Sequence, residues 1–474
     1  MNKIKVRFHV TLLLLSIFIG IAACKGDDDN PSPNPNPNTG EPTATVKTAN
    51  DWIDSIMRED YLWYSEIPAR DKLNYTADPK TFFTSFLSNN DGNEYPDGAH
   101  YYYSYIESTT STKSISKIDY SYGLEFMLYR LSQKSYAANI LYVADNSPAS
   151  EAKLKRGDFI ITMNGDSITS SNYTLLYGST AMSLKTAKYE DKLITQPGKV
   201  ELGAARSIED DPVYLDSVYT RPGKKIGYLV YNHFTAGKTD NDTKYNEELL
   251  SLSQKFKTAG VNEFILDLRY NNGGLISCAE LLSTILAPKD VFGSTFCTLE
   301  YNDKQNPQTD KISFNSRWIS GGSNLNLNTL YVLVTEETAS ASELVVNCLK
   351  PYMNVITIGK NTEGKNVGSV SYTDNRFTWH LQPIICKIYN ADNQSDYGKV
   401  GFTPDYEYDE SEPANLNNFL AFGDTDESLL NIALSIIDGT YSTKAGTRSS
   451  NSSLKKVASS LDRKASNAVI IDQK

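Results

Sequence analysis

The sequence predicts a multidomain α+β fold in which three regions of different pattern follow one another. Apolar residues recur at helical spacing in residues 47–112, and short strand patterns with Gly-Asp and Asn-Gly turns fill residues 113–206. In residues 207–440 strands alternate with helices, which is the pattern of crossover connections between parallel strands. We therefore expect the last region to be an α/β domain with a mainly parallel sheet.

The first residues have the pattern of a bacterial export signal. A basic stretch, residues 1–7, is followed by the apolar run 10–21 and then by Cys24. The run is too short to span a membrane and ends at small residues, as a cleaved signal peptide does. The Ile-Ala-Ala-Cys ending resembles a lipoprotein cleavage box, which implies that residues 1–23 are removed and that Cys24 is acylated.

Residues 24–46 are expected to form a lipid anchor and a Pro/Asn-rich tether, because their repeated Asn-Pro units can build no core. The acidic residues 25–29 resemble the signal that sends Bacteroidetes lipoproteins to the outer face of the outer membrane, although an acidic cluster also keeps a tether hydrated. The resemblance implies a lipid-anchored outer-membrane protein that is exposed at the cell surface, or otherwise one that faces the periplasm.

The charge of the chain limits its partners. The formal net charge is −11, and loss of residues 1–23, which hold three basic residues and no acid, makes it −14. Phosphate backbones and anionic lipids repel such a protein, so we expect no nucleic-acid partner and membrane contact only through the anchor. We expect neither a cofactor nor a metal, because no phosphate-loop or paired metal-ligand spacing is present.

Four widely spaced cysteines remain in the body of the chain. An oxidising compartment would permit two disulfides, but the wide spacing favours buried, reduced thiols. These residues are Cys278, Cys297, Cys348 and Cys386.

Residues 47–112 are predicted to form a small helical domain. Thr48 and Asp51 have the spacing of a capping box, and apolar residues follow on one helical face as far as Pro68. Asp78, which precedes a proline, marks the start of a second helix with four apolar residues.

The middle region, residues 113–206, has the signals of a β module. A Gly-Asp turn, an Ile-Ile strand and an Asn-Gly turn follow a short predicted helix. This order resembles a PDZ domain, with Gly123, Leu124, Glu125 and Phe126 in the place of its carboxylate-binding loop. The resemblance implies that the loop binds the terminal carboxylate of a peptide while the adjoining strand pairs with the peptide. The alternative is a β module that binds nothing.

A serine at a strand-to-helix turn is the strongest candidate for chemistry. Residues 330–334 have the pattern of a buried strand, and apolar residues recur at helical spacing after Ser340. A helix start offers N–H groups and a positive dipole end that stabilise an oxyanion, with the Ala341 N–H as the natural donor. The same stretch also fits an ordinary N-cap with a carboxylate, Glu343, in the first turn.

A second strand pattern, at residues 355–358, leads into a Gly-rich loop that holds Lys360 and Lys365. A lysine can act as a base near neutral pH only if burial lowers its pKa. The two segments together resemble the carboxy-terminal processing, or tail-specific, proteases, whose motif runs Ser-Ala-Ser-Glu, helix, strand and Gly-Lys. This resemblance implies that Ser340 is the nucleophile and Lys365 the general base, with Glu343 completing the catalytic set, and that Lys360 is the weaker candidate base.

A second motif of the same family lies between a predicted strand and a predicted helix. It reads Asp-Leu-Arg-Tyr-Asn-Asn-Gly-Gly-Leu and ends at Leu275. In the processing proteases this loop supplies the second oxyanion donor, which implies the N–H of Gly273 or of Gly274. The family often has glutamine four residues past the catalytic lysine, where this chain has Ser369, so we expect Glu343 or Ser369 to orient the lysine.

The resemblance covers residues 47–440 and implies a helical domain, a PDZ-like module and an α/β Ser-Lys protease domain over residues 207–440. Residues 441–474, rich in Ser, Lys and Ala, are predicted to be a flexible tail in which only residues 468–471 are apolar enough to dock. The function implied is a serine endopeptidase that cuts unfolded or extended polypeptides through an acyl-enzyme on Ser340. The alternative is a non-enzymatic, peptide-binding surface lipoprotein that keeps the protease fold.

Overall fold

The computed structural model describes residues 47–95, 98–109, 118–190, 193–239, 241–442, 454–463 and 469–472. The export signal, Cys24 and the tether lie outside the described residues. Residues Val46–Lys474 form one compact unit. Within the described part of the chain, no helix is long and apolar enough to cross a membrane.

The first described region begins with helices, as predicted, but residues 93–94, 100–101 and 105–108 of the predicted helical domain form strands, because they pair with one another and with a strand of the last region. Helix α1 (Ala49–Asp60) begins at Thr48, whose hydroxyl accepts from the Asp51 N–H while the Asp51 carboxylate accepts from the Thr48 N–H. Helix α2 (Pro79–Thr84) begins at Asp78, which accepts from the Lys80 N–H. The chain leaves α1 earlier than Pro68 and continues in two short 3-10 helices, η1 (Tyr64–Glu66) and η2 (Arg70–Lys72).

The middle region is an antiparallel sheet in the order β10-β9-β7-β6-β5-β24, in which β8 pairs with β7 and β24 (Lys455–Ser459) comes from the C-terminal residues. Its elements are β5 (Leu124–Arg130), β6 (Tyr136–Val143), α3 (Pro148–Glu151), β7 (Phe159–Met163), β8 (Asp166–Ser167), η3 (Tyr173–Tyr177), β9 (Met182–Glu190) and β10 (Leu193–Leu202). Beside it, β4 (Ile118–Ser121) pairs with β11 (Arg206–Glu209). The predicted hairpin is confirmed, because β7 and β8 pair through an Asn-Gly turn at Asn164 and Gly165, both with positive φ.

The last region is built on a sheet in the order β12-β13-β14-β17-β18-β23. These strands are β12 (Val213–Arg221), β13 (Lys224–Tyr231), β14 (Glu263–Asp267), β17 (Thr329–Val334), β18 (Asn354–Gly359) and β23 (Tyr406–Glu407). Strand β12 is antiparallel to β13, and each later pairing is parallel. The helices of this region are α4 (Lys244–Ala259), α5 (Ile276–Leu286), η4 (Lys289–Val291), η5 (Ser316–Ile319), α6 (Ala341–Leu349), η6 (Leu416–Asn418) and α7 (Ser428–Asp438).

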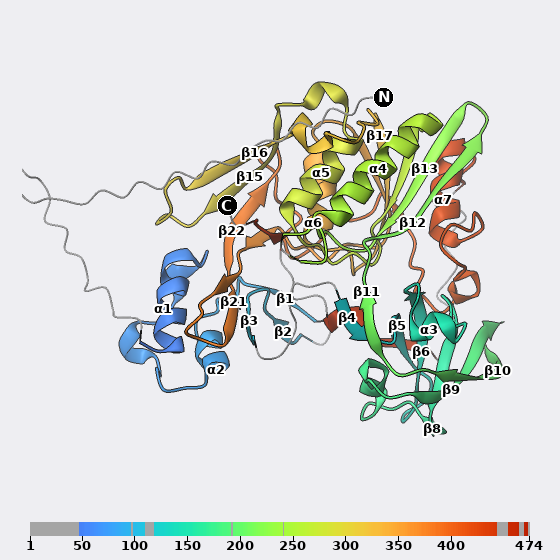
Figure 1. Cartoon of the computed structure of the whole chain (residues 1–474), viewed down its shortest axis with the longest axis horizontal. Coiled ribbons are helices and arrows are strands. Elements are labelled where there is room, and N and C mark those ends of the chain that lie inside the picture. Colours follow the sequence, from blue (N-terminus) through green and yellow to red (C-terminus); the bar gives the residue numbers. More distant parts are fainter. Residues whose placement is uncertain are drawn as a thin grey trace, which may run out of the picture. The chain divides into compact units, whose positions relative to one another are not determined.

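Helices cover both faces of this sheet, with α4, α5 and α6 on one side and α7 on the other (Figure 1). Alternate residues of β13 serve the two cores: Leu229 and Tyr231 join the core with α4 to α6, whereas Tyr228 and Val230 join the core with α7. A strand buried on both faces has an almost continuous apolar sequence. The four cysteines of this region, Cys278, Cys297, Cys348 and Cys386, are buried thiols, as predicted.

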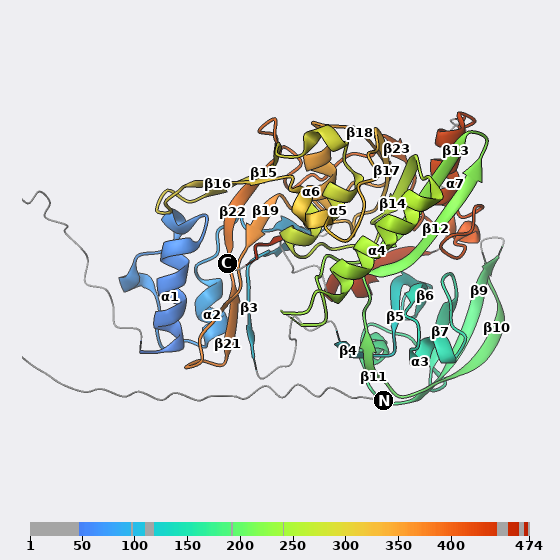
Figure 2. The ribbon, with the colours of Figure 1, turned by 45° about the horizontal axis from the view of Figure 1, so that its top comes forward.

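Smaller sheets lie between the helical region and the main sheet of the last region, and one of them includes a strand of the helical region (Figure 2). One sheet has the order β16-β15-β22-β19-β25, formed by β15 (Thr295–Tyr301), β16 (Thr309–Ser313), β19 (Val367–Ser369), β22 (Ile384–Tyr389) and β25 (Val469–Ile470). In another, β21 (Trp379–Gln382) pairs with β20 (Tyr372–Thr373) and with β3 (Tyr105–Ser108). The pair β1 (Asn93–Glu94) and β2 (His100–Tyr101) precedes β3. Because β3 comes from the first region, the two regions share a sheet.

The C-terminal residues correct the sequence prediction. Residues 441–474 are predicted to be a flexible tail, but β24 (Lys455–Ser459) pairs antiparallel with β5, and β25 pairs parallel with β19. The 3-10 helix η7 (Ser460–Arg463) follows β24. The Ser- and Lys-rich composition conceals this docking, because main-chain hydrogen bonds to a sheet edge and a few buried side chains are enough to hold an added strand. The prediction that residues 468–471 dock is confirmed for Val469 and Ile470, which form β25.

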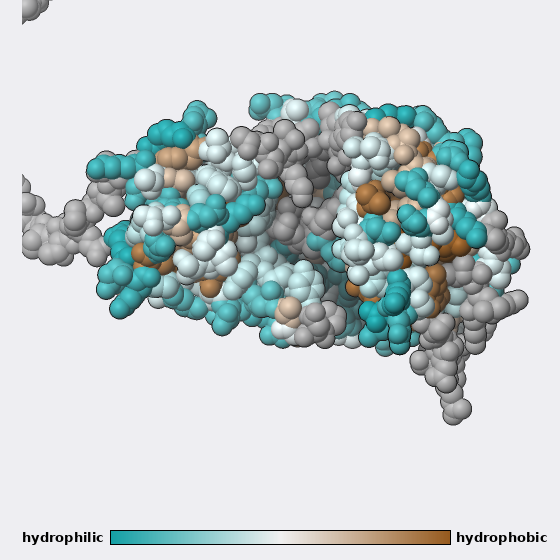
Figure 3. Space-filling view, turned by 90° about the horizontal axis from the view of Figure 1, so that it is seen from below, coloured by the Kyte–Doolittle hydropathy of each residue, from teal (hydrophilic) through white to brown (hydrophobic). Residues whose placement is uncertain are grey.

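The surface is mixed in character. On the face in Figure 3, hydrophobic residues form small patches among hydrophilic ones. The large hydrophobic side chains exposed in the described part of the chain come from separate elements: Tyr95, Leu175, Val400 and Val457. Single exposed apolar residues of this kind are ordinary, and they indicate no broad docking face.

Candidate active site

Ser340 lies at the turn from β17 to α6, where the sequence predicts it. Its backbone angles are φ 62° and ψ −116°, which lie outside the regions that L-residues ordinarily adopt. Such a residue costs on the order of 1–3 kcal/mol, and residues of this kind cluster at functional sites. The side chain is fully buried, and within the described residues its hydroxyl oxygen has no hydrogen-bond partner. The backbone of Ser340 is therefore constrained, and its hydroxyl makes no hydrogen bond within the described residues.

Glu343 connects the serine to the lysine loop. Its Oε2 accepts from the backbone N–H of Ser340 at 2.9 Å and from that of Lys365 at 2.8 Å. Its Oε1 accepts from the Gly364 N–H at 2.7 Å and from the Thr362 hydroxyl at 2.5 Å. Burial raises the pKa of this carboxyl to about 7, although the four donors act to lower it. One side chain thus fixes the backbone of both predicted catalytic residues.

Lys365 is fully buried at the end of this loop. Burial lowers the pKa of its ammonium group to about 8, while the carboxylates of Glu363, Glu343 and Asp91 act in the opposite direction. The Lys365 Nζ also lies over the ring of Tyr103, 4.5 Å from the ring centroid. An amine with this pKa is neutral in about a tenth of the molecules at pH 7, far more often than an exposed lysine. The side chain is therefore suited to accept a proton.

The second lysine of the loop has a different environment. Lys360 Nζ lies 2.9 Å from Asp409 Oδ2 and 3.4 Å from Glu336 Oε2. Burial acts to lower the pKa of Lys360, but these two carboxylates outweigh it and raise the pKa. A lysine held charged in ion pairs is a poor base, so the geometry separates the two candidates in favour of Lys365.

The Gly-Gly loop after β14 packs directly against the serine. A Cβ atom on Gly273 would lie 2.6 Å from the Ser340 Cβ and 2.9 Å from the Ala341 nitrogen. Gly273 and Gly274 also have φ values of 106° and 140°, which other residues rarely adopt. Only glycine allows this approach, which brings the backbone of the loop beside the predicted oxyanion donor, the Ala341 N–H.

Asn271 holds this loop in place, a role that sequence reasoning did not assign. Its Oδ1 accepts from the Gly273 N–H at 2.9 Å, and its Nδ2 donates to the Tyr231 carbonyl at 2.7 Å. Its own carbonyl accepts from the Ala339 N–H at 3.1 Å and from the Ser342 hydroxyl at 2.8 Å. The asparagine therefore ties the Gly-Gly loop to the turn that carries Ser340.

Sequence reasoning also missed the residues that the first region contributes. The hydroxyls of Tyr101 and Tyr103 both donate to Glu363 Oε1, the latter at 3.2 Å. Glu363 lies two residues before Lys365, and the Tyr103 ring contacts the lysine itself. The sequence holds no local signal for this contact, because the pairing of β3 with β21 brings the tyrosines to the site. The helical region is thus part of the lysine environment.

Ser369 stands where the processing proteases often have glutamine. Its hydroxyl accepts from Gln382 Nε2 at 2.9 Å and donates to the Val469 carbonyl at 3.3 Å. The side chain of Gln382, which lies on β21, therefore places a glutamine amide beside Ser369. Of the two residues expected to orient the lysine, Glu343 accepts a hydrogen bond from the backbone N–H of Lys365.

The four residues of the predicted peptide-binding loop lie at the start of β5. Gly123 has a positive φ of 74°, and its carbonyl accepts from the Ala144 N–H. The Phe126 N–H donates to the Ser460 hydroxyl at 2.8 Å, and that hydroxyl donates to Glu125. Because the Glu125 carboxylate repels another carboxylate, this loop suits a hydroxyl group better than a free chain terminus.

Two family models match this chain, and both describe one peptidase family. The model described as Peptidase family S41 matches residues 225–408, and the Peptidase S41 N-terminal domain model matches residues 48–105. The crystal structure of an S41 protease from Bacteroides fragilis is 39% identical, with a TM-score of 0.74, and the match covers 82% of this chain and 98% of that chain. The chain belongs to peptidase family S41.

Curated S41 relatives are more distant. A CtpA-like serine protease from Staphylococcus aureus is 27% identical over 297 residues, which is 61% of this chain and 55% of the relative. A carboxyl-terminal-processing protease from Picosynechococcus is 24% identical over 263 residues, 55% of this chain and 58% of the relative. The chain thus spans little more than half the length of these relatives. The resemblance to the processing proteases is confirmed at the level of the family, and the mixed α/β fold with an N-terminal helical region agrees with it.

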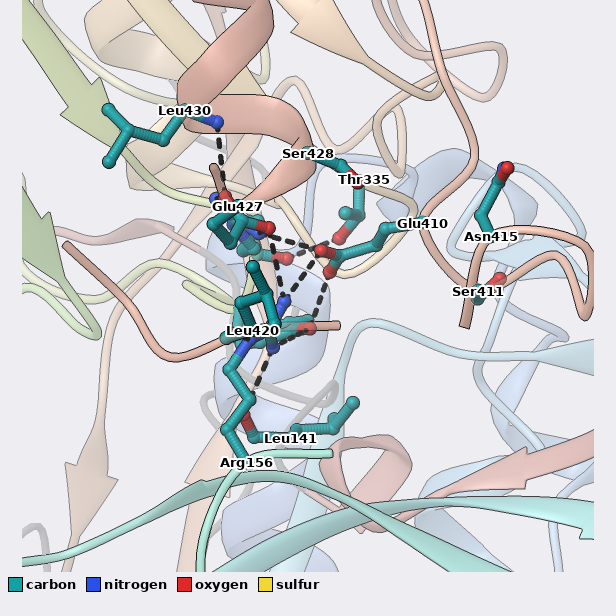
Figure 4. Close-up of polar contacts among 12 residues, drawn as sticks. Leu141, Arg156, Thr335, Glu410, Ser411, Asn415, Leu420, Glu427, Ser428 and Leu430 are labelled. Carbon is teal, nitrogen blue, oxygen red and sulfur yellow. Dashed lines mark hydrogen bonds and ion pairs between the residues drawn. The ribbon is translucent and has the colours of Figure 1, made fainter. Parts of the chain in front are cut away.

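A buried ionic cluster connects the β module of this S41 chain to its last region. Arg156 Nη2 lies 2.7 Å from Glu410 Oε2, and Arg269 Nη1 lies 2.6 Å from the same oxygen and 2.9 Å from Glu427 Oε1. Figure 4 shows Arg156, Glu410 and Glu427 converging. The Arg156 guanidinium also lies over the Phe419 ring, 3.6 Å from its centroid. Breaking a buried pair of this kind is costly, so the cluster should hold the module rigidly.

The carboxylates of this cluster are neutralised by arginine. Among the described residues, no group of three or more His, Cys, Asp or Glu side chains is placed to hold a metal ion.

Proposed function

We propose that this chain is a serine endopeptidase of the C-terminal processing type, with Ser340 as nucleophile and Lys365 as general base. The observation that carries the proposal is the Glu343 carboxylate, which bonds the backbone N–H of both residues. The lowered pKa of the buried lysine supports its role as a base. Membership of family S41, together with relatives named as proteases, supports polypeptides as the substrate class.

In the first step the neutral Lys365 amine takes the proton of the Ser340 hydroxyl while Oγ attacks the scissile carbonyl carbon. The π electron pair moves onto the carbonyl oxygen, which becomes an oxyanion. The Ala341 N–H, at the start of α6, stabilises this charge together with an N–H of the Gly-Gly loop. The Gly273 N–H already donates to Asn271, which favours Gly274 as the second donor.

Collapse of the tetrahedral intermediate restores the carbonyl and breaks the C–N bond, and the leaving nitrogen takes the proton from the Lys365 ammonium. The ester on Ser340 then reacts with water, from which the amine takes a proton as the oxygen attacks. The second intermediate releases the carboxylic acid product, and Ser340 regains its proton from the lysine. The cycle returns both groups to their starting states.

The proposal is tested by incubating the purified protein with unfolded casein beside variants of the two lysines and the serine. Ser340→Ala and Lys365→Arg should each abolish cleavage, whereas Lys360→Ala is the matched control that should retain it. Circular dichroism confirms that each variant is folded. Cleavage by Ser340→Ala at the wild-type rate would contradict the assignment of the nucleophile.

We further propose that the middle region, residues 113–206, is a PDZ-like module that binds the polypeptide substrate along β5. Its support is the antiparallel β sheet with β5 at the predicted loop, an arrangement that adds peptides as an extra strand. Hydrogen exchange tests this idea on a chain that ends at residue 441 and carries Ser340→Ala, because in the full chain β24 already pairs with β5. Added casein should slow exchange at β5 relative to β10, and unchanged exchange at β5 would contradict the binding role.

We propose that the mature chain is anchored in the outer membrane through acylated Cys24 and is exposed at the cell surface. The support is the cleavage-box pattern and the acidic residues 25–29. Acyl chains, and not the acidic fold, then supply the membrane affinity. Cys24→Ala should release the chain from sedimented membranes, and protease added to intact cells should digest the wild-type chain only if it faces outward.

A further inference from the structure

The described C-terminal residues occupy two strand edges that a bound polypeptide would use. Strand β24 runs antiparallel along β5, with Lys455 opposite Arg130 and Ser459 opposite Met127. Strand β25 then pairs parallel with β19, which begins two residues after Lys365. Both belong to the red end of the colour bar in Figure 1. The described C-terminal residues therefore lie at two places on the course proposed for a substrate, beside the β module and beside the catalytic loops.

Strand β25 is hydrogen-bonded on both of its edges. The Ile470 N–H donates to the Gly274 carbonyl at 2.9 Å, and the next N–H, that of Ile471, donates to the Ser369 carbonyl at 2.9 Å. Successive N–H groups of an extended strand point to opposite sides. The tail therefore lies between the Gly-Gly loop, which packs against Ser340, and the strand that follows Lys365. A substrate strand that approaches the serine between these segments meets the tail.

The start of the tail is fixed beside the turn that leads to Ser340. Lys456 forms an ion pair with Glu336, and its Nζ also lies 3.9 Å from Glu337 Oε1. Both glutamates lie in the turn after β17. Burial acts to raise the pKa of Glu336, but Lys456 and Lys360 outweigh it and lower the pKa to about 2. The contact therefore joins two charged groups.

Buried side chains hold the tail in place in addition to its main-chain hydrogen bonds. Leu461 and Val469 are 0% and 1% exposed, and they belong to two different cores of the folded unit. Val457 lies at the bulge between the pairs made by Lys456 and Ala458, and it is 36% exposed. Buried and exposed valines in one tail provide a matched pair for substitution.

We propose that the described C-terminal residues, 454–463 and 469–472, act as a built-in pseudosubstrate, which occupies the edge of β5 and the place beside the Gly-Gly loop and excludes polypeptides until it is displaced. The proposal rests on the proposed peptidase function, and it adds the class of ligand that binds at these two places. That ligand is an extended polypeptide with a hydroxyl residue at the position of Ser460 and an aliphatic residue at the position of Val469. Because the tail is tethered, its effective concentration is on the order of millimolar.

Binding is tested without catalysis, on a chain that ends at residue 441 and carries Ser340→Ala. A fluorescein-labelled peptide of residues 454–472 should bind it saturably, as measured by fluorescence anisotropy. A peptide with Leu461→Asp and Val469→Asp should bind at least about tenfold more weakly, because both side chains are buried. A dissociation constant above about 1 mM would overturn the proposal, since a tethered tail would then be mostly undocked.

Activity is tested on unfolded casein with substitutions in the full chain. If the tail is docked nine-tenths of the time, Val469→Asp should raise kcat/KM about tenfold, and Val457→Asp should leave it unchanged. Truncation after residue 441 should act in the same direction. Truncation also uncovers the buried β5 residues Met127 and Tyr129, so Val469→Asp decides the question if the shortened chain loses its near-ultraviolet circular dichroism.

The outcomes separate the two proposals. Unchanged kcat/KM in Val469→Asp overturns the pseudosubstrate. Release of the tail from the wild-type chain, but not from Ser340→Ala, shows that the tail is a substrate and also overturns it. If neither the full nor the shortened chain cleaves casein, the proposed function fails, while the anisotropy measurement still judges whether residues 454–472 dock.

Discussion

Replacing Glu343 by glutamine should show how much of the site depends on one buried carboxylate. The carboxylate accepts two hydrogen bonds at each oxygen. A glutamine keeps one accepting oxygen, but its NH2 group meets the other pair of donors. The less costly orientation places the NH2 group beside Thr362, whose hydroxyl can turn to accept, and leaves the Gly364 N–H without an acceptor.

The expected loss of stability follows from the number of hydrogen-bond donors left without an acceptor. One buried unsatisfied donor costs about 1–3 kcal/mol, so Glu343→Gln should lower the free energy of unfolding by about that amount. Glu343→Ala leaves three backbone N–H groups and a cavity, and should cost at least roughly twice as much. The pKa of Glu343 is raised from 4.5 to about 7, so its contribution to stability is complete below about pH 4.5 and lost as pH rises through about 7.

The assay is urea unfolding followed by circular dichroism at about pH 5 and about pH 8, with kcat/KM on casein measured beside it. The wild-type chain should lose more stability between these two pH values than Glu343→Gln, which cannot titrate at this position. The exposed Glu412→Gln is the control for a general charge effect. Wild-type stability and kcat/KM in Glu343→Gln would refute the view that this side chain fixes the catalytic geometry.

Three other substitutions test separate parts of the account. Tyr103→Leu removes the ring that favours the charged lysine, and should lower the midpoint of the kcat/KM pH profile by about 0.4–1.5 units; Tyr103→Phe, which keeps the ring, should not. Arg156→Met leaves Glu410 without one guanidinium and should lower the free energy of unfolding by about 3–5 kcal/mol in urea, with the exposed Arg130→Met as control. Lys360→Ala should keep kcat/KM within about threefold, and a complete loss would transfer the role of base to Lys360.

The features that the sequence predicts are those whose signal lies in a few adjacent residues. The capping box at Thr48, the Asn-Gly hairpin after β7 and the strand-to-helix turn at Ser340 each depend on local backbone geometry. The Gly-Gly loop is equally local, because positive φ and close approach both require glycine at Gly273. Such signals need no knowledge of the tertiary fold.

The features that sequence reasoning missed depend on contacts between distant segments. Tyr103 reaches Lys365 only because β3 pairs with β21, and Arg156 meets Glu410 only when the β module packs on the last region. The C-terminal strands are the clearest case, because their Ser- and Lys-rich composition is also that of a disordered tail. Docking is decided by a few buried side chains, such as Val469, and by the strand edges that receive them.

The proposed mechanism depends on the removal of the Ser340 proton by the neutral form of Lys365, which burial makes accessible near neutral pH. The most direct measurement is the rate at which a fluorophosphonate probe labels Ser340 as a function of pH, followed by mass spectrometry of the labelled peptide. The rate should rise with pH through about 8, the lowered pKa of Lys365. Lys365→Arg should abolish labelling, because arginine keeps the charge and accepts no proton at these pH values. Labelling of Lys365→Arg at the wild-type rate, or a wild-type rate that does not change between about pH 6 and pH 10, would contradict the account.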